Sequence, residues 1–179
     1  MRTCKNIKKH NKKTFTKKQY NSKDGMLTKI WGPTMWHTLH TISFNYPVKP
    51  THEQKIKYRN FILSLKHVLP CGKCRENLVN NLKQLPLTMN KMKSRYTFSR
   101  YIFKLHELIN TMLNKVSNLS YEDVRDRYEH FRARCKDMPI VDSRKTEKGC
   151  TEPLKGAKTK CIMKIVPDEH SCETFEVNL

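Results

Sequence analysis

Residues 68–74 read Val-Leu-Pro-Cys-Gly-Lys-Cys, and the two cysteines at the end of this stretch are the only closely spaced pair among the seven in the chain. Two thiols separated by two residues can close a disulfide, bind a metal or transfer electrons. Pro70 ends the helical pattern before it, because proline lacks a backbone N–H. The pair Cys71 and Cys74 is therefore predicted to open a new helix.

Helical patterns flank this stretch on both sides. Upstream, Thr51 and Gln54 are spaced as a capping box. Apolar residues then recur at helical spacing at Tyr58, Phe61, Ile62, Leu65 and Val68. Downstream, a shorter helix carries Leu78, Val79, Leu82 and Leu85 and ends before Pro86.

Three further helices are predicted. One begins near residues 31–33, with Pro33 at its first position, and ends at Tyr46-Pro47. The strongest pattern runs for five turns, over residues 98–116. Ser120 and Asp123 cap a last helix, whose inward residues are Val124, Tyr128 and Phe131. Since no βαβ pattern occurs, the predicted fold class is all-α: a four-helix bundle plus a short fifth helix.

Composition divides the 179 residues into three parts. Residues 1–27 form a basic arm, predicted to be disordered at least to about Tyr20, residues 28–137 form the helical domain, and residues 138–179 form an irregular, cysteine-containing tail with a short strand at 161–166. The net charge of +20 allows weak polyanion contacts through the arm. The chain has no membrane-spanning apolar run and no secretory signal pattern.

The chemistry of the cysteine pair leaves several alternatives. A structural zinc site needs a second ligand pair, and His37 and His40 are a weak candidate for one, so no metal site is predicted. A thioredoxin-like motif needs a preceding strand, whereas a helix precedes this pair. Two incidental core cysteines fit poorly at a helix start. A dithiol that works with a flavin remains, because a helix N-terminus stabilises a thiolate and a flavin accepts its electrons.

Helical faces elsewhere in the chain offer candidates for holding a flavin. Trp36 and His40 lie four apart on one helix, where they share a face. His106, Asn110 and Lys115 lie on the strongest helix. These side chains could stack on an adenine and hold ribose and phosphates. Taken one at a time, the aromatic residues and histidines are equally typical of a packed core.

Taken in order, these motifs resemble the Erv/ALR flavin-linked sulfhydryl oxidases. The resemblance covers about residues 29 to 135. Its pieces are Gly32-x-x-x-Trp36-x-x-Leu39-His40-Thr41 with Tyr46-Pro47, Pro50-Thr51-x-Glu53-Gln54 with Phe61-Ile62, Pro70-Cys71-x-x-Cys74, and His106-x-x-x-Asn110-x-x-Leu113-x-Lys115.

This resemblance implies an enzyme that oxidises dithiols to disulfides through FAD, with dioxygen reduced to hydrogen peroxide. It assigns Cys74 as the thiol next to the flavin and Cys71 as the thiol that accepts electrons from dithiol protein substrates. It also implies a homodimer. The expected FAD-binding residues are Gly32, Trp36, His40, Tyr46, His106, Asn110, Lys115 and Tyr128.

Several positions depart from the family pattern. Glu107 replaces a usual Asn, Asn114 a usual Gly, and Pro33 a usual Arg. Tyr128 stands in place of a late Trp that stacks near the adenine. Tyr121 stands in place of a cysteine that would pair near Cys135, so the usual structural disulfide is predicted to be absent.

The sequence leaves the electron route to Cys71 open. Cys150, Cys161 and Cys172, and less strongly Cys4, are candidates for a shuttle. Compact members with Gly-Pro in the first motif resemble those of large DNA viruses, which implies a location in the host cytoplasm or the virion. The alternative location is the mitochondrial intermembrane space. The alternative function is a non-catalytic helical binding or virion module that uses the basic arm and tail.

Overall fold

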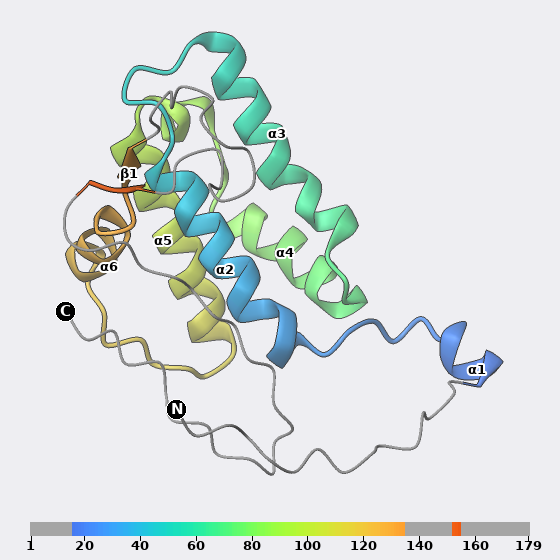
Figure 1. Cartoon of the computed structure of the whole chain (residues 1–179). Coiled ribbons are helices and arrows are strands. Elements are labelled where there is room, and N and C mark those ends of the chain that lie inside the picture. The colour runs from blue at the N-terminus through green and yellow to red at the C-terminus, as the bar shows by residue number, and fades with distance from the viewer. Residues whose placement is uncertain (1–15, 135–151, 155–179) are drawn as a thin grey trace, which may run out of the picture.

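The structure is a computed structural model that describes residues 16–134 and 152–154 (Figure 1). Its helices are α1 (Lys17–Tyr20), α2 (Thr28–Phe44), α3 (His52–Val68), α4 (Gly72–Gln84), the 3-10 turn η1 (Met89–Met92), α5 (Arg95–Met112) and α6 (Tyr121–Glu129). Two short strands, β1 (Ala133–Arg134) and β2 (Glu152–Pro153), pair antiparallel. The predicted strand at 161–166 and the candidate shuttle cysteines lie outside the described residues.

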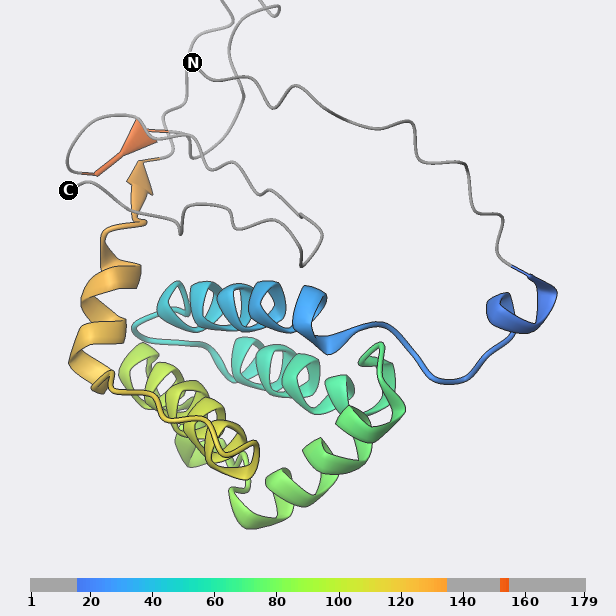
Figure 2. The same cartoon turned by 90° about the horizontal axis from the view of Figure 1, so that it is seen from below.

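The predicted all-α bundle is confirmed. Helix α2 packs against α5, α3 packs against α4, and α4 also contacts α5. Helix α6 contacts both α2 and α5 and stands across the end of the bundle (Figure 2). The strand pair β1–β2 was not predicted; its first strand, β1, comes soon after α6. Helix α1, a single exposed turn closed by a Thr16–Gln19 capping box, was not predicted either.

The bundle encloses one main core. Tyr46, Ile62, Met92, Phe98 and Ile102 are its most deeply buried large side chains. The predicted Thr51–Gln54 capping box is present at the start of α3, and Ser120 with Asp123 caps α6. The predicted inward stripe of α3 is wrong in part, because Phe61 is 40% exposed and Val68 66% exposed.

Helix α2 begins earlier than the sequence predicts. It starts at Thr28, so Pro33 lies inside the helix rather than at its first position. The earlier start has a tertiary cause. The Met26 N–H donates to the Pro70 carbonyl at 2.7 Å, and the Trp31 indole N–H donates to the Met26 carbonyl at 3.0 Å. These bonds hold the chain in place one turn before the proline.

Helix α5 ends earlier than predicted, at Met112. Asn114 has φ of 53°, a left-handed conformation that asparagine tolerates better than most residues. The Lys115 N–H donates to the Asn110 carbonyl at 2.8 Å, and the Asn114 N–H donates to the Thr111 carbonyl at 3.0 Å. This Schellman-type ending leaves Val116, a predicted core residue, 87% exposed.

None of the helices in the described part of the chain has both the length and the apolar character needed to cross a bilayer. Among the same residues, no cluster of three or more histidine, cysteine or acidic side chains is arranged to hold a metal ion.

Candidate active site

Cys71 and Cys74 form a disulfide at the N-terminus of α4. Cys71 is the N-cap residue, and its Sγ accepts a hydrogen bond from the backbone N–H of Cys74 at 3.2 Å. Both cysteines are half-buried. Free N–H groups and the partial positive charge at a helix N-terminus favour a thiolate over a thiol. The position predicted for the pair, at a helix start behind Pro70, is confirmed.

The two sulfurs have different surroundings. Cys74 packs against the main hydrophobic core, together with Trp31 and Trp36 of α2. Its Sγ lies 3.6 Å from the Oγ1 of Thr28, the first residue of α2. Cys71 lies at the end of the loop that follows α3. Thus Cys74 is the sulfur that faces α2.

One face of α2 leads away from Cys74. Thr28, Gly32, Trp36 and His40 follow one another at intervals of four residues, so each lies about one turn beyond the last. Gly32 is buried, yet a Cβ built on it would meet only the Thr28 Cγ2, at 3.4 Å. A side chain at Gly32 would therefore begin in contact with the Thr28 methyl group.

Trp36 and His40 meet His106 of α5, as the sequence predicts. The Trp36 and His106 rings stack with centroids 3.9 Å apart and planes 8° apart. The His40 Nε2 lies 3.0 Å from the His106 Nδ1. The His40 Nδ1 is buried and has no hydrogen-bond partner among the described residues. Three predicted site residues therefore form one cluster, which retains an unsatisfied polar atom.

Both histidines of this cluster favour the neutral form. Burial, followed by the nearby His106 and His37, lowers the pKa of His40 to about 3. Burial also lowers the pKa of His106, where Glu107 opposes the shift and Lys115 adds to it. At neutral pH the pair can therefore share a single N–H between the two rings without charge repulsion.

Asn110 and Lys115 lie near this cluster at the end of α5. The Asn110 Nδ2 donates to the Glu107 Oε1 at 3.0 Å, so the residue that departs from the family pattern orients the amide. Lys115 is placed by the Schellman-type ending at Asn114, and its charge acts on His106. Asn114 adopts the left-handed conformation that readily accommodates the family's usual glycine.

Tyr128 of α6 closes the far side of this group. Its ring lies 5.3 Å from that of His40 and stacks on Phe44 with centroids 5.4 Å apart. The Tyr128 hydroxyl lies 3.1 Å from the His37 Nδ1. The sequence indicates His37 only as a weak metal candidate, whereas its contacts with Tyr128 and Phe131 make it part of this aromatic group.

Tyr46 does not join the predicted site residues. Its side chain is fully buried, its hydroxyl donates to the Met92 carbonyl at 2.9 Å, and its ring contacts those of Tyr58 and Phe98. Tyr46 is therefore a core residue that fixes the turn after α2. The structure therefore does not bring Tyr46 into the Trp36–His40–His106 cluster, and its role toward FAD stays a prediction.

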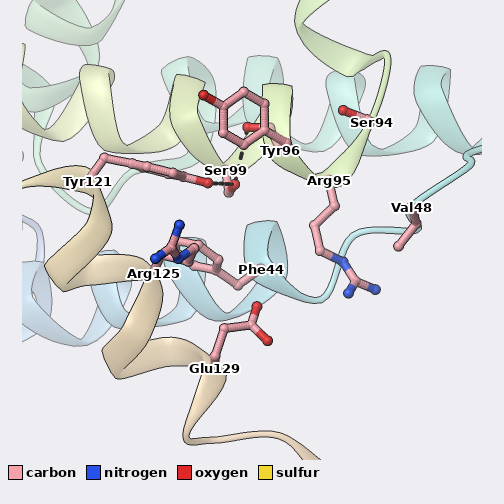
Figure 3. Close-up of a pocket in the computed structure, with 9 residues that line it drawn as sticks. All are labelled: Phe44, Val48, Ser94, Arg95, Tyr96, Ser99, Tyr121, Arg125 and Glu129. Atoms are coloured by element: carbon pink, nitrogen blue, oxygen red, sulfur yellow. Dashed lines mark hydrogen bonds between the residues drawn. The ribbon is translucent and has the colours of Figure 1, made fainter.

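A separate cavity of about 330 Å³ lies between the end of α2, the start of α5 and α6 (Figure 3). Its wall contains Tyr121, whose hydroxyl lies 2.8 Å from the Ser99 Oγ. The nine residues that line this cavity include no cysteine. Tyr121 attaches α6 to α5 by packing and this hydrogen bond.

Comparison with known proteins places this arrangement in a family. The Erv1 / Alr family matches residues 33–132, which include both cysteines and the Trp36–His40–His106 cluster. The chain belongs to the Erv1 / Alr family. One curated relative is a protein of Acanthamoeba polyphaga mimivirus named "probable FAD-linked sulfhydryl oxidase". It is 34% identical to this chain over 99 residues, which cover 55% of this chain and 68% of the relative. An African swine fever virus "FAD-linked sulfhydryl oxidase" is 31% identical over 99 residues, which cover 55% of this chain and 80% of that relative.

Solved structures support the family fold. The yeast Erv1 core superposes with a TM-score of 0.53 at 19% identity, covering 70% of this chain and 96% of that one. The FAD-binding domain of Erv1 from Saccharomyces cerevisiae gives a TM-score of 0.52 at 23% identity, covering 57% and 94%. At this level of identity, the similarity concerns the fold of this Erv1 / Alr member.

Proposed function

We propose that the chain is an FAD-dependent thiol oxidase that forms disulfide bonds in protein substrates. The observation that carries this proposal is the Cys71–Cys74 disulfide at the start of α4, joined through Thr28 to the α2 face that holds Trp36 and His40. The overall reaction takes a dithiol and dioxygen to a disulfide and hydrogen peroxide. Family membership and the names of the viral relatives support the same activity.

The residues present fit FAD. Buried Gly32 carries no side chain on the face that leads from Cys74 to Trp36, the Trp36–His106 stack offers a flat aromatic surface, and the His40 Nδ1 is a buried polar atom that needs a partner. Asn110, Lys115 and Tyr128 surround the same group and complete the proposed set. When bound, FAD supplies an acceptor for the electron pair of a dithiol and passes the pair to dioxygen.

The cysteines themselves perform thiol–disulfide exchange. A substrate thiolate attacks the Cys71 Sγ and forms a mixed disulfide, while Cys74 leaves as a thiolate. The second substrate thiol then attacks the mixed disulfide, which releases the oxidised substrate and leaves Cys71 reduced. The inward position of Cys74, against the core and α2, supports its assignment as the sulfur that passes the electron pair onward. Cys71, at the loop, is the partner for substrates.

The neutral histidine pair supports binding rather than proton transfer. Because burial lowers the pKa of both rings, neither is charged at neutral pH, and the pair holds α2 and α5 at a fixed separation. The Lys115 ammonium and the Asn110 amide are then proposed as the polar groups that contact a nucleotide. The aromatic Tyr128 would stack where a tryptophan is usual.

We also propose that the chain forms a homodimer through the outer face of α3. Phe61 and Val68 lie seven residues apart on this helix, and both are exposed. Apolar side chains repeated at this spacing form a stripe that a second copy could cover. Sedimentation velocity of the chain and of Phe61→Glu tests this: the variant is expected to sediment as a monomer, and an unchanged dimer would contradict this face.

The site of action is proposed from the relatives. Viral members are among the most similar proteins, so we infer that the chain oxidises substrates in the host cytoplasm or the virion. A yeast relative is named mitochondrial, which keeps the intermembrane space as the alternative. Residues 1–27, which contain nine Lys/Arg, are proposed to make only weak polyanion contacts.

Oxygen uptake tests the activity. The purified chain is expected to consume oxygen with a small dithiol and to release an equivalent amount of hydrogen peroxide. Cys74→Ala is expected to abolish turnover. Cys71→Ala is expected to do the same with protein substrates. Replacement of a cysteine outside the pair, Cys135→Ala, is the matched control and should leave oxidation of the small dithiol intact. Turnover by Cys74→Ala would contradict the proposal.

A further inference from the structure

Thr28 makes a direct contact with the redox pair from a segment 46 residues away. Its Oγ1 lies 3.6 Å from the Cys74 Sγ. Because Cys74 is in a disulfide, its sulfur carries no hydrogen, so the threonine hydroxyl must be the donor. Thr28 is the first residue of α2, and the residue before it supplies no side-chain cap. Its hydroxyl is therefore directed to sulfur at the very start of a helix.

Thr28 is held there by a short segment that precedes it. Gly25 has φ of +85°, and a Cβ at this position would lie 2.5 Å from the Pro70 carbonyl oxygen and 3.0 Å from the Cys71 Cα. The next residue, Met26, donates its N–H to the same carbonyl at 2.7 Å. We call residues 25–28 the docking strap, because they attach the start of α2 to the loop that carries the cysteine pair.

The strap is anchored at its other side as well. The Trp31 indole N–H donates to the Met26 carbonyl at 3.0 Å, and Trp31 packs against the same core as Cys74. One backbone hydrogen bond to Pro70 and one side-chain hydrogen bond from α2 thus fix the position of the strap. The Thr28–Cys74 contact therefore depends on the tertiary bonds that hold the strap, and not only on the rotamer of an exposed threonine.

We propose that Thr28 is a positioning residue for the proposed thiol oxidation: its hydroxyl donates a hydrogen bond to the Cys74 sulfur and stabilises the thiolate formed when the disulfide is reduced. The proposal rests on the function proposed above. In the exchange step, the substrate thiolate forms a bond to the Cys71 sulfur, the Cys71–Cys74 bond breaks, and Cys74 leaves with the electron pair as a thiolate. No proton is needed on Cys74 if the Thr28 hydroxyl and the α4 N-terminus stabilise the charge.

The physical basis is that a hydrogen bond to an ionised acceptor is roughly twice as strong as one between neutral groups. The Thr28 donor therefore stabilises a Cys74 thiolate more than a Cys74 thiol or disulfide. Charged side chains also border the pair. On α4 these are Lys73 and Arg75, with Glu76 paired to Lys73, and the segment around the strap adds Asp24 and Lys29. These charged residues are unchanged in every variant below, so they affect the Cys74 midpoint equally in all of them.

The test measures the ionisation of Cys74 without turnover. Cys71→Ser is made in the full chain loaded with FAD, so that Cys74 is free, and the rate of its alkylation by iodoacetamide is followed against pH by peptide mass mapping. Thr28→Val keeps the shape of the side chain and removes the hydroxyl. It is expected to move the midpoint of Cys74 alkylation upward by about one pH unit, a tenfold change in the thiolate equilibrium.

Two further variants distinguish the hydroxyl from the fold. Thr28→Ser keeps the donor and is expected to retain the parent midpoint. Thr38→Val is the matched control, since the Thr38 hydroxyl donates to a carbonyl within α2 and lies on an exposed turn; it too should retain the parent midpoint. If Thr28→Val does not fold, Thr28→Ala takes its place with the same expectation.

The results separate this inference from the function. A parent-like midpoint in Thr28→Val, or an equal upward shift in Thr28→Ser, overturns the role of the hydroxyl even if the chain oxidises dithiols. An upward shift in Thr28→Val with rescue in Thr28→Ser supports it even in a preparation that does not turn over. Loss of oxygen uptake in the parent chain would instead count against the proposed function.

Discussion

The His40 Nε2 lies 3.0 Å from the His106 Nδ1, and this contact links α2 to α5 beside the stack of Trp36 on His106. The pair is neutral at neutral pH, because burial lowers the pKa of both rings. Protonation of both rings would place two positive charges side by side in a buried cluster. The stability of the proposed cofactor site therefore depends on pH.

The first prediction is a loss of stability in mild acid. The pKa of His40 is about 3 in the folded chain, below the ordinary value of 6.5. The unfolded chain consequently binds more protons between these two pH values, and stability falls as the pH drops from about 6.5 toward 3. The slope approaches about 1.4 kcal/mol per pH unit for one proton.

His40→Gln tests this slope, since glutamine keeps a polar group near Nε2 and does not titrate. Denaturant unfolding at several pH values should show a shallower pH dependence in His40→Gln than in the parent. The exposed His52→Gln serves as the reference for the substitution itself. An identical slope in His40→Gln and the parent would contradict the assignment.

The second prediction concerns FAD affinity. Trp36→Ala removes one half of the Trp36–His106 stack. Stacking of a ring system on an aromatic side chain contributes about 1–3 kcal/mol, so the FAD dissociation constant should rise roughly ten- to hundredfold. Quenching of flavin fluorescence on titration measures this. Tyr20→Ala, on the exposed turn α1, is the control, and an equal loss in both variants would argue against the site.

The third prediction concerns the docking strap. Gly25→Ala places a Cβ 2.5 Å from the Pro70 carbonyl oxygen, which is too close, and forces a side chain onto a left-handed φ. Strain of this kind costs on the order of 1–3 kcal/mol. The strap should detach locally, so that hydrogen exchange at the Met26 amide rises about tenfold or more. Gly72→Ala, whose Cβ would meet its nearest neighbour at 3.6 Å, should leave this exchange rate unchanged.

The fourth prediction concerns the attachment of α6. The Tyr121 hydroxyl and the Ser99 Oγ are 2.8 Å apart in a buried position. Tyr121→Phe should lower the free energy of unfolding by about 1 kcal/mol, the usual net value of such a hydrogen bond. Ser99→Ala should cost a similar amount, and the double variant should cost less than the sum. Strict additivity would show that the two hydroxyls do not interact.

The sequence predicted the helices around the cysteine pair well because their signals are local. Three of these signals act within one turn and were confirmed: the capping pairs Thr51–Gln54 and Ser120–Asp123, and the end of the helix before Pro70. The spacing of Trp36 and His40 also predicted that their side chains lie together on α2, since residues four apart share a helix face. Together with His106, these residues meet as predicted.

What the sequence missed depends on tertiary contacts. The start of α2 at Thr28 follows from the bond between Met26 and Pro70, which no local pattern reveals. Because Thr28 lies at the edge of the basic arm, nothing in its sequence context marked it as a neighbour of Cys74. The core role of Tyr46 was missed for a related reason: its motif position predicted a site residue, and no local pattern shows that its hydroxyl donates to the Met92 carbonyl.

The central claim is that Cys74 passes electrons to bound FAD, and the visible absorbance spectrum under anaerobic conditions tests it most directly. The purified chain should be yellow, an added dithiol should bleach the flavin absorbance, and air should restore it. Cys74→Ala should keep its colour and resist bleaching. A folded, colourless chain that never takes up FAD, or a Cys74→Ala protein that bleaches as fast as the parent, would contradict the account.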